Sequence, residues 1–595
     1  MTVLVERALH ATGLLAAFND AGVLTLADVH TARRIALLGG EPDESMHLAI
    51  ALTVRALRHG SVCVDLGSVS RTAASDDNGV DVAALPWPDP VRWRSACAGS
   101  PVVSARGEPG RPLRLVRGLL YLDRYWREED QIGRELRQRA VSPPPPADRA
   151  RLRADLDRLF GDGDDKQRLA AAVSCLRRVT VLAGGPGTGK TTTIARLLAV
   201  LAAQPGGPLR IALAAPTGKA AARLEEAVRE VSRRLPGPPL PDLRASTLHR
   251  LLGRRPGSRT RFRHHRSHRL PYDVVVVDET SMVSLTLMAR LIEAVRPDAR
   301  LILVGDPDQL ASVEAGAVLG DIVAADGPGE PGLQAALAEV GEREAVVNGV
   351  VTLDRIWRFG GDLAALASAV RAGDDDRVVA LLRAGGRQLA FVETPAADCA
   401  DLRTEALAAL RAVAEAAGRG DAGTALRGLD AHRLLCAHRR GPYGVSHWTR
   451  ETGRWLAATD LTAWEPGRPL LITANDYDAG LHNGDTGVVV RTPDGPRAAF
   501  ARGGDIVLIP PSRLAEAQPL YAMTVHRSQG SQFDRVSLVL PPATSPLFTR
   551  ELFYTAVTRA RTGLRILGTE DAVRAAVTRP IARASGLRES LAVAA

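Results

Sequence analysis

The sequence predicts an α/β protein with two tandem domains built on parallel sheets, and a separate domain before them. Short, continuous apolar runs alternate with helical segments from about residue 165 onward, and the same alternation returns after about residue 430. Such runs are typical of strands buried on both faces of a parallel sheet. A glycine-rich loop follows the first of these runs. The excess of basic charge lies in the part of the chain after residue 115.

Length and composition narrow the class of protein. A chain of 595 residues exceeds the size at which one hydrophobic core stops growing, so we expect about three to four domains. No apolar run approaches the roughly 20 residues that span a bilayer, and the first residues lack the charge order of a signal peptide. The five cysteines form no CxxC pair, which argues against a zinc module or a disulfide framework. We therefore expect a cytoplasmic protein that does not associate with a membrane.

Arginine supplies nearly all of the positive charge. Of the 76 basic residues, only Lys166, Lys190 and Lys219 are lysines. Residues 1–115 hold 11 arginines and 12 acidic residues, whereas the rest of the chain has a net charge of +10. The first segment therefore has the balance of a neutral domain, and the remainder is the part expected to meet a polyanion.

A connecting segment is predicted at residues 116–150, after an N-terminal domain at 1–115. Residues 116–140 have helical spacing, and 142–147, SerProProProProAla, form a stiff polyproline-type linker. The first α/β domain is expected at 151–350. Its predicted strands and helices alternate in the order Val179–Ala183, Thr191–Ala202, Arg210–Ala214, Ala220–Arg233, Val274–Val277, Leu287–Val295 and Leu301–Val304.

The second α/β domain is expected at residues 351–595. An alanine-rich helical segment is predicted at 361–430. Residues 476–516 carry the turn signals Asn483-Gly484 and Asp494-Gly495 and predict a small β-insert, which we expect to be SH3-like. The predicted strands of the parallel sheet are Leu434–Ala437, Leu470–Thr473, Val536–Leu540 and Leu564–Leu567.

A phosphate site is predicted directly after the first strand. The pattern GxxxxGK[ST] is matched, between a strand and a helix as it requires, by Gly184, Gly185, Pro186, Gly187, Thr188, Gly189, Lys190 and Thr191. Backbone N–H groups of the loop and of the helix N-terminus, through Thr192, would surround the phosphates of ATP. Lys190 would reach the β- and γ-phosphates, and the hydroxyl of Thr191 would bind Mg²⁺.

Polar residues follow two later strands. Asp278 and Glu279 come directly after a strand of four valines, so Asp278 is expected to hold Mg²⁺ and Glu279 to orient or deprotonate the attacking water. Gln309 follows the next strand, at the carboxyl edge of the sheet where ligands bind. It is a candidate sensor of the γ-phosphate.

Two segments of the C-terminal half carry a recognisable pattern. They are TyrAlaMetThrValHisArgSerGlnGlySer at 521–531 and LeuPheTyrThrAlaValThrArgAlaArg at 552–561. Both resemble the late motifs of superfamily 1 helicases, of the SF1B group, in which two RecA-like domains clamp ATP. The resemblance implies that Arg559, and Arg358 in IleTrpArgPhe, reach the γ-phosphate across the cleft as arginine fingers. It also implies that Gln167 reads the adenine and that Gly530 lies at the nucleotide. Residues 310–321 resemble specifically the RecD branch, the alpha subunits of exodeoxyribonuclease V (RecBCD).

A DNA-binding groove is also implied by the resemblance. Hydroxyl and imidazole groups suit contacts to phosphate and sugar, which position a strand without reading its sequence. Residues 254–269 hold seven arginines and three histidines with no acid and are a candidate DNA-facing loop, and we do not expect these histidines to hold a metal. The residues implied to contact one DNA strand are Pro216, Thr217, Lys219, Thr247, His249, Thr524, His526 and Ser528.

The resemblance implies an ATP-dependent 5′–3′ DNA helicase, the motor subunit of a RecBCD-type complex that processes double-strand ends in recombinational repair. ATP and Mg²⁺ would be its cofactors, and residues 1–115 would dock RecB-type and RecC-type subunits. No nuclease site is expected in this chain. Two alternatives remain, a stand-alone 5′–3′ helicase of the same branch and a scaffold subunit that binds ATP only for assembly.

Overall fold

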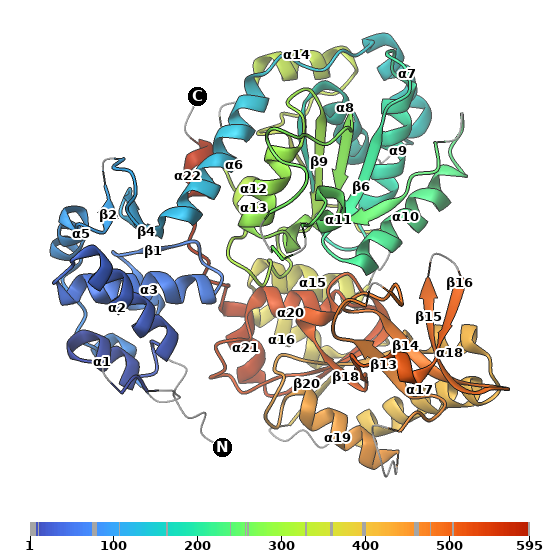
Figure 1. Cartoon of the computed structure of the whole chain (residues 1–595). Helices are drawn as coiled ribbons and strands as arrows, with labels where there is room; N and C mark the ends of the chain where they lie inside the picture. The colour runs from blue at the N-terminus through green and yellow to red at the C-terminus, as the bar shows by residue number, and fades with distance from the viewer. Residues whose placement is uncertain are drawn as a thin grey trace.

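The computed structural model describes residues 7–592 apart from 10, 74–79, 106, 162–164, 238–239, 256, 259–260, 328–329, 358–360, 395–399, 457–462, 477 and 503–504. An N-terminal body lies beside two α/β domains (Figure 1). Within the described part of the chain, no helix is long and apolar enough to cross a membrane.

The N-terminal body packs helices on a four-stranded sheet with the strand order β1-β4-β3-β2. Arg117 and Gly118 have φ of 52° and 82°, as a two-residue hairpin turn between β3 and β4 requires. This hairpin carries the sheet to Leu122, so the prediction of helix from residue 116 is wrong before Asp123. The elements are α1 (Gly13–Asp20), α2 (Leu26–Gly39), α3 (Glu44–Arg58), β1 (Cys63–Asp65), α4 (Val69–Thr72), η1 (Val82–Ala84), α5 (Pro90–Gly99), β2 (Val103–Ser104), β3 (Leu113–Val116) and β4 (Leu119–Leu122).

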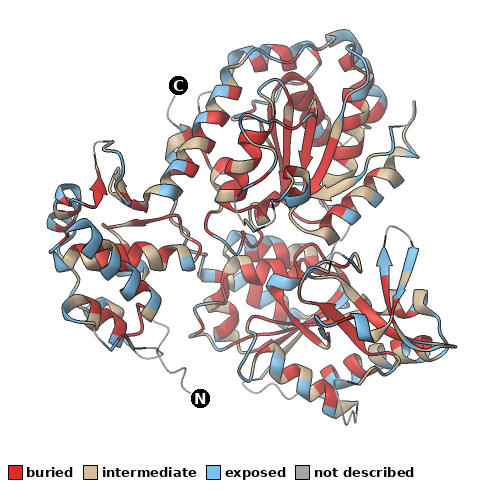
Figure 2. Cartoon of the chain, in the orientation of Figure 1, coloured by how far each residue is buried: buried red, intermediate tan, exposed pale blue. Residues whose placement is uncertain are grey.

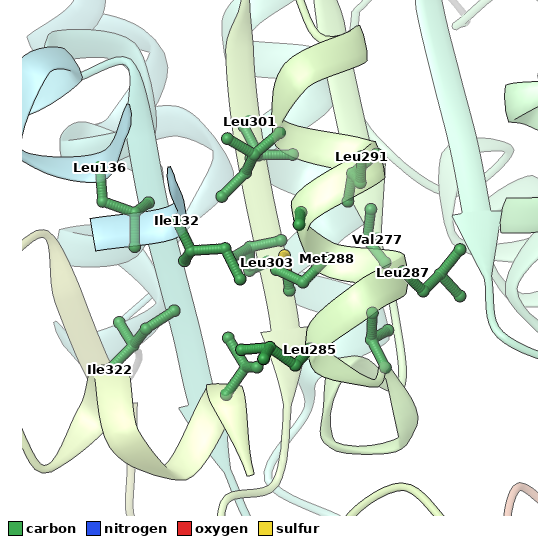
Figure 3. Packing of buried hydrophobic residues seen from close by; sticks show 14 of the residues in the cluster. Ile132, Leu136, Val277, Leu285, Leu287, Met288, Leu291, Leu301, Leu303 and Ile322 are labelled. Carbon is green, nitrogen blue, oxygen red and sulfur yellow. The ribbon is translucent and has the colours of Figure 1, made fainter. Parts of the chain in front are cut away.

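Helix α6 (Asp123–Val141) joins this body to the first α/β domain. Its buried side chains Ile132 and Leu136 belong to the same hydrophobic cluster as Met288 and Leu303 of that domain (Figure 3). The proline-rich residues that follow are not helical, and the chain turns there into α7 (Arg149–Leu159).

The first α/β domain has a six-stranded, wholly parallel sheet in the order β10-β5-β9-β8-β6-β7. The four predicted strands and three predicted helices are confirmed, and β7 and β10 add the two edges. Figure 2 shows the sheet buried between its helices. The elements are α8 (Asp165–Leu176), β5 (Val179–Gly184), α9 (Lys190–Ala203), β6 (Ile211–Ala215), α10 (Gly218–Ser232), β7 (Ala245–Thr247), α11 (Leu248–Leu252), β8 (Val274–Val277), η2 (Thr280–Met282), α12 (Leu285–Ala294), β9 (Arg300–Gly305), α13 (Val318–Val323), α14 (Pro331–Glu339) and β10 (Val350–Leu353).

The second α/β domain has a five-stranded parallel sheet in the order β11-β20-β19-β12-β18. Strand β11 lies inside the segment predicted to be helical throughout, so that prediction is wrong at Leu389–Glu393. The elements are α15 (Asp362–Ala372), α16 (Asp375–Ala384), β11 (Leu389–Glu393), α17 (Ala400–Gly418), α18 (Ala422–Gly428), β12 (His432–Cys436), α19 (Val445–Trp455), β18 (Ala522–Thr524), η4 (Val525–Ser528), β19 (Phe533–Val539), α20 (Arg550–Val557), β20 (Ala560–Gly568) and α21 (Glu570–Thr578).

A second, antiparallel sheet is inserted in this domain, in the order β16-β15-β14-β13-β17. The run Leu470–Thr473 forms β13 of this sheet, so its assignment to the parallel sheet is wrong. Its run is apolar because its two faces enter different cores: Leu470 and Ile472 pack with Leu481 and Leu514 in the small sheet, and Leu471 packs in the core of the second α/β domain. The elements are β13 (Pro469–Ile472), β14 (Thr486–Thr492), β15 (Gly495–Arg502), β16 (Asp505–Ile509), η3 (Pro511–Arg513) and β17 (Ala517–Pro519).

The C-terminal segment (residues 579–592) runs from the second α/β domain back to the N-terminal body and α6. After α21, the backbone N–H of Val62 donates to the carbonyl of Ala584 at 2.8 Å, and Gly586 donates to the carboxylate of Glu129 at 3.2 Å. Burial raises the pKa of Glu129 to about 7. Helix α22 (Leu587–Ala592) then buries Leu587 in the cluster that contains Ile132. This segment therefore connects the second α/β domain to the N-terminal body and α6.

Candidate functional site

The predicted phosphate loop lies at the carboxyl end of β5, where α9 begins at Lys190. Gly187 and Gly189 have φ of 80° and 87°, a region that residues with a Cβ rarely adopt. The Nζ of Lys190 donates to the carbonyls of Gly184 and Gly185, at 2.6 and 2.9 Å. The ammonium therefore lies across the loop, where it can meet an anion that the loop's N–H groups hold.

The other predicted loop residues have two kinds of environment. Pro186 and Thr188 are buried, and the hydroxyl of Thr188 donates to the carbonyl of Gly185 at 2.8 Å. Thr191 and Thr192 are partly exposed in the first turn of α9. The hydroxyl of Thr191 is therefore available to a ligand, whereas Thr188 supports the loop.

Asp278 and Glu279 follow β8, at the same carboxyl edge of the sheet. Burial, and then the charge of Glu279, raise the pKa of Asp278, while Lys190 acts in the opposite direction. Glu279 has φ 52° and ψ 40°, a left-handed conformation that costs about 1–2 kcal/mol for a residue with a Cβ. The raised pKa indicates that the buried carboxylate of Asp278 lacks part of its counter-charge. Together with the Thr191 hydroxyl it forms the oxygen donor set that Mg²⁺ prefers, so the residues fit this ion.

The segment after β9 (residues 306–310) holds a second buried carboxylate beside Gln309. Oδ2 of Asp306 accepts a hydrogen bond from Nε2 of Gln309 at 2.7 Å, and Oδ1 accepts one from the backbone N–H of Asp308 at 3.1 Å. Asp306 and Gln309 are 1% and 6% exposed. Burial raises the pKa of Asp306, while the charge of Lys190 and these donors lower it.

Arg559 of the second α/β domain reaches across to this segment. Its Nη2 donates to Oε1 of Gln309 at 2.9 Å, and its Nε and Nη1 donate to the carbonyls of Thr555 and Ser531 at 2.9 and 3.1 Å. The guanidinium is buried, and burial lowers its pKa. The Oγ1 of Thr555 also accepts from the backbone N–H of Leu310 at 3.0 Å. Both domains therefore border the predicted phosphate site.

Gln167 and Trp357 flank the far end of the phosphate loop. A Cβ at Gly189 would lie 2.6 Å from Nε2 of Gln167 and 3.6 Å from Cδ1 of Trp357. The indole of Trp357 is about half exposed, with the guanidinium of Arg355 3.9 Å above its ring. An aromatic ring and an amide thus both lie next to Gly189 of the loop. Arg358, predicted as a second arginine finger, lies outside the described residues.

The predicted DNA-contacting residues of the first domain lie at the ends of β6 and β7, which are neighbours in the sheet. Thr217 and Thr247 cap α10 and α11, since their Oγ1 atoms accept from Ala220 and Arg250 at 3.2 and 3.3 Å. Pro216 precedes the first of these caps. Helices α10 and α11 therefore begin next to each other at this edge of the sheet.

Lys219 and His249 lie in the first turn of α10 and α11. Burial lowers the pKa of Lys219, and its charged neighbours include Asp430 of the second domain and Asp485 of the small sheet. Lys219 therefore lies where three parts of the molecule meet. The ring of His249 is 5.9 Å from that of Phe262.

The matching residues of the second domain lie at the end of β18 and in η4. His526 is exposed, but Thr524 is 6% exposed and Ser528 is fully buried. The Ser528 hydroxyl donates to the carbonyl of Val525 at 2.7 Å, so it stabilises the turn and does not reach a groove. The carbonyl of Gly530 accepts from Nη1 of Arg223 on α10 at 2.5 Å, a further bond between the domains.

Comparison with known proteins agrees with this architecture. Residues 20–121 match the sequence model of the RecBCD enzyme subunit RecD, N-terminal domain, residues 167–315 that of an AAA domain, and residues 519–567 that of a UvrD-like helicase C-terminal domain. The chain is 52% identical over 594 residues to RecBCD enzyme subunit RecD of Mycolicibacterium smegmatis, which covers 97% of this chain and 99% of that protein. The chain belongs to the RecD family. It is also 33% identical to the ATP-dependent RecD2 DNA helicase of Deinococcus radiodurans, over 68% of this chain and 48% of that protein. Among solved structures it is similar to Bacteroides Pif1 bound to ssDNA, with 15% identity, a TM-score of 0.37 and coverage of 68% of this chain and 92% of that one.

In the basic segment of this RecD family member, the described residues at 254–255, 257–258 and 261–269 pair as a short hairpin on the first domain. Arg254 pairs with Phe262, whose ring is buried in the domain core and anchors the hairpin. The rings of His264 and His268 stack with centroids 4.9 Å apart. Among the described residues there is no cluster of His, Cys, Asp and Glu that could hold a metal. Among the described residues of this hairpin, the exposed arginines are Arg254, Arg255, Arg261, Arg263 and Arg266.

Four residues at the RecD site were not assigned a role from the sequence. The bonds of Asp306 to Tyr554, and of Arg223 to Gly530, form only where the two domains meet. Trp357 could have been found, because an aromatic residue next to the predicted arginine finger is a signal in itself. Residues on separate motifs, by contrast, give no sequence signal that they meet.

We expect Asp278→Asn to stabilise the unliganded protein. Because its pKa is raised in the folded state, ionised Asp278 makes stability fall as the pH rises from its ordinary pKa through the raised one. A neutral amide removes this effect. The thermal midpoint at pH 8 in EDTA should therefore rise, by about 2–4 °C per kcal/mol, and scanning fluorimetry measures it.

The matched control is Asp534→Asn, at an exposed carboxylate of the second domain. Its midpoint should not change. A lower midpoint for Asp278→Asn than for the wild type would contradict the account of a carboxylate held without its counter-charge.

Proposed function

We propose that the chain is an ATP-dependent DNA helicase that moves 5′ to 3′, the motor subunit of a RecBCD-type complex that processes double-strand DNA ends in recombinational repair. The observation that supports this most is the bond from Arg559 to Gln309. It brings a cation of the second α/β domain to the carboxyl edge of the first domain's sheet, the edge at which the phosphate loop also lies. A nucleotide at that loop would be contacted by both domains, so its hydrolysis would change their arrangement.

The residues of the site suit ATP hydrolysis. ATP would supply the phosphoanhydride bond whose cleavage drives the motor. Lys190 and the N–H groups of the loop would hold its phosphates, and Thr191 and Asp278 would hold Mg²⁺. Glu279 would accept a proton from the attacking water, and Arg559 would neutralise charge that develops on the γ-phosphate. We keep Arg358 as a second finger in this proposal.

The DNA strand would cross both domains at the edge formed by α10, α11 and η4. Thr217, Thr247 and their neighbours on the first domain, and His526 on the second, would contact phosphate and sugar, with Lys219 adding charge. Since these contacts lie on both domains, nucleotide-driven opening and closing would move one set along the strand relative to the other. An ATP-driven DNA motor works where ATP and DNA are, so a cytoplasmic location is part of the proposal.

The other parts of the chain would serve the assembly. We propose that the N-terminal body, expected at 1–115 and extended by its sheet to Leu122, docks RecB-type and RecC-type subunits, and that DNA cutting belongs to a partner. The five-stranded antiparallel sheet would be the SH3-like insert. A stand-alone helicase is the second candidate, but residues 20–121 match the model of the RecD N-terminal domain, and the identity is 52% to the M. smegmatis RecD subunit against 33% to the RecD2 helicase. This difference favours the subunit.

The test of the function is ATPase and unwinding activity of the purified chain, alone and with its partner subunits. Single-stranded DNA should stimulate ATP hydrolysis, and Lys190→Ala should abolish it because the phosphates lose their cation. A duplex with a 5′ tail should be unwound and one with a 3′ tail should not. ATP binding without hydrolysis, even in the full complex, would favour a scaffold role, and unwinding from the 3′ tail would reverse the polarity.

Trp357 should stack on the adenine. Base–aromatic stacking is worth about 1–3 kcal/mol per base, so Trp357→Ala should raise the KM for ATP by about 10-fold and change kcat much less. Trp357→Tyr keeps an aromatic face and should stay near wild type. An unchanged KM in Trp357→Ala would exclude the stacking role.

The basic hairpin at residues 254–269 should contribute non-specific DNA affinity. Each arginine that contacts a phosphate adds about one unit to the slope of log K against log salt. Arg261→Ala combined with Arg263→Ala should lower that slope by about two and weaken binding of all sequences alike. Arg234→Ala is the control, because Arg234 is an exposed arginine two residues after the end of α10. If both variants bind with the wild-type slope, the hairpin does not face DNA.

A further inference from the structure

The segment 306–310 of the first α/β domain is held by the second domain through four hydrogen bonds. Besides the bonds from Arg559 and to Thr555, the hydroxyl of Tyr554 donates to Oδ2 of Asp306 at 3.2 Å, and Nε2 of Gln529 donates to the carbonyl of Leu310 at 2.8 Å. Tyr554, Thr555 and Arg559 lie on or directly after α20. One helix therefore brings three of the four groups to the segment.

The carboxylate of Asp306 fixes the orientation of the Gln309 amide. A carboxylate only accepts hydrogen bonds, so the amide must turn its NH2 toward Asp306. Its oxygen then faces Arg559, which only donates. The NH2 has a second proton, which is left for an acceptor such as a phosphate oxygen. The opposite orientation would set the amide oxygen against the carboxylate and the NH2 against the guanidinium.

Tyr554 holds Asp306 in this arrangement from the other domain. Asp306 is almost fully buried, and a buried carboxylate needs several donors to stay charged. The hydroxyl of Tyr554 is one of three donors to it. The same hydroxyl lies 3.0 Å from the position of a Cβ at Gly185, so it also touches the phosphate loop.

We infer that Asp306 and Tyr554 are positioning residues for ATP hydrolysis, which orient the Gln309 amide so that it offers an N–H to the γ-phosphate only when the second domain is closed on the first. This inference rests on the proposed ATPase function. When α20 moves away, Tyr554 and Arg559 leave together, and Gln309 loses the partner of its oxygen while Asp306 loses a donor. Hydrolysis thereby becomes dependent on the closed arrangement of the two domains.

The test is Tyr554→Phe in the full chain, and in the complex with partner subunits if the chain alone is inactive. The ring is kept and only the hydroxyl is lost. We expect kcat of the DNA-stimulated ATPase to fall about 10-fold, the effect of one hydrogen bond to a charged group, with little change in KM. Asp306→Asn should also lower kcat, because an amide at 306 accepts either orientation of Gln309.

A double-mutant cycle separates positioning from a structural role. In a Gln309→Ala background, Tyr554→Phe should have no further effect on kcat, because the group it orients is gone. Tyr121→Phe is the matched control, since it also removes a buried phenol–carboxylate bond, 3.1 Å to Glu129, away from the site. It should leave kcat unchanged.

The outcomes distinguish this inference from the function on which it rests. An active wild type with an unchanged Tyr554→Phe, or an equal loss in both backgrounds, would overturn the positioning role and leave the ATPase standing. A wild type without ATPase in any assembly would overturn both. A selective loss of kcat that disappears in the Gln309→Ala background supports the inference.

Discussion

Charge buried between the two α/β domains is the constraint on which the rest of the structure depends. Asp278 and Asp306 end neighbouring strands, and Lys190 and Arg559 are the cations that act on them. Taking such groups out of water costs several kcal/mol per ion unless they find partners. Part of that compensation comes from the second domain, so contact between the domains and neutralisation of the site occur together. A triphosphate with its cation would change this balance directly, which is why a site of this kind can convert nucleotide state into domain arrangement.

The architecture brings these groups together by simple means. In a parallel sheet all strands end at one edge, so the residues after β5, β8 and β9 meet there although they are far apart in sequence. The same edge carries the caps of α10 and α11, so the predicted nucleotide and DNA contacts share one rigid support. The C-terminal segment adds a mechanical link, because it runs from α21 past Val62 and Glu129 to a helix docked on α6. A subunit bound to the N-terminal body would therefore touch a part of the molecule that is tied to the second domain.

Local patterns in the sequence predicted most of the fold and of the site. They failed where contacts between distant segments determine the structure. The phosphate loop, Asp278 and Gln309 were found because each follows a strand that its own residues specify. The run at Leu470–Thr473 looked like a strand of the parallel sheet because it is apolar throughout, but Leu470 and Ile472 pack inside the small sheet and Leu471 packs in the core of the second α/β domain. Ser528 fits a DNA motif by type, yet its hydroxyl is used inside its own turn. Tyr554 and Asp306 could not be paired from the sequence, because only the contact between two domains brings them within hydrogen-bond distance.

The central claim is that nucleotide at the phosphate loop fixes the two α/β domains against each other. Spin labels at Arg234→Cys and Arg454→Cys, whose native side chains are 76% and 73% exposed, would report the distance between the domains. The described cysteines are buried and would not compete, and Cys399 would be replaced by serine. The account predicts that single-stranded DNA with a non-hydrolysable ATP analogue narrows the distance distribution, and that Lys190→Ala does not respond. The same distribution with and without bound analogue would contradict it.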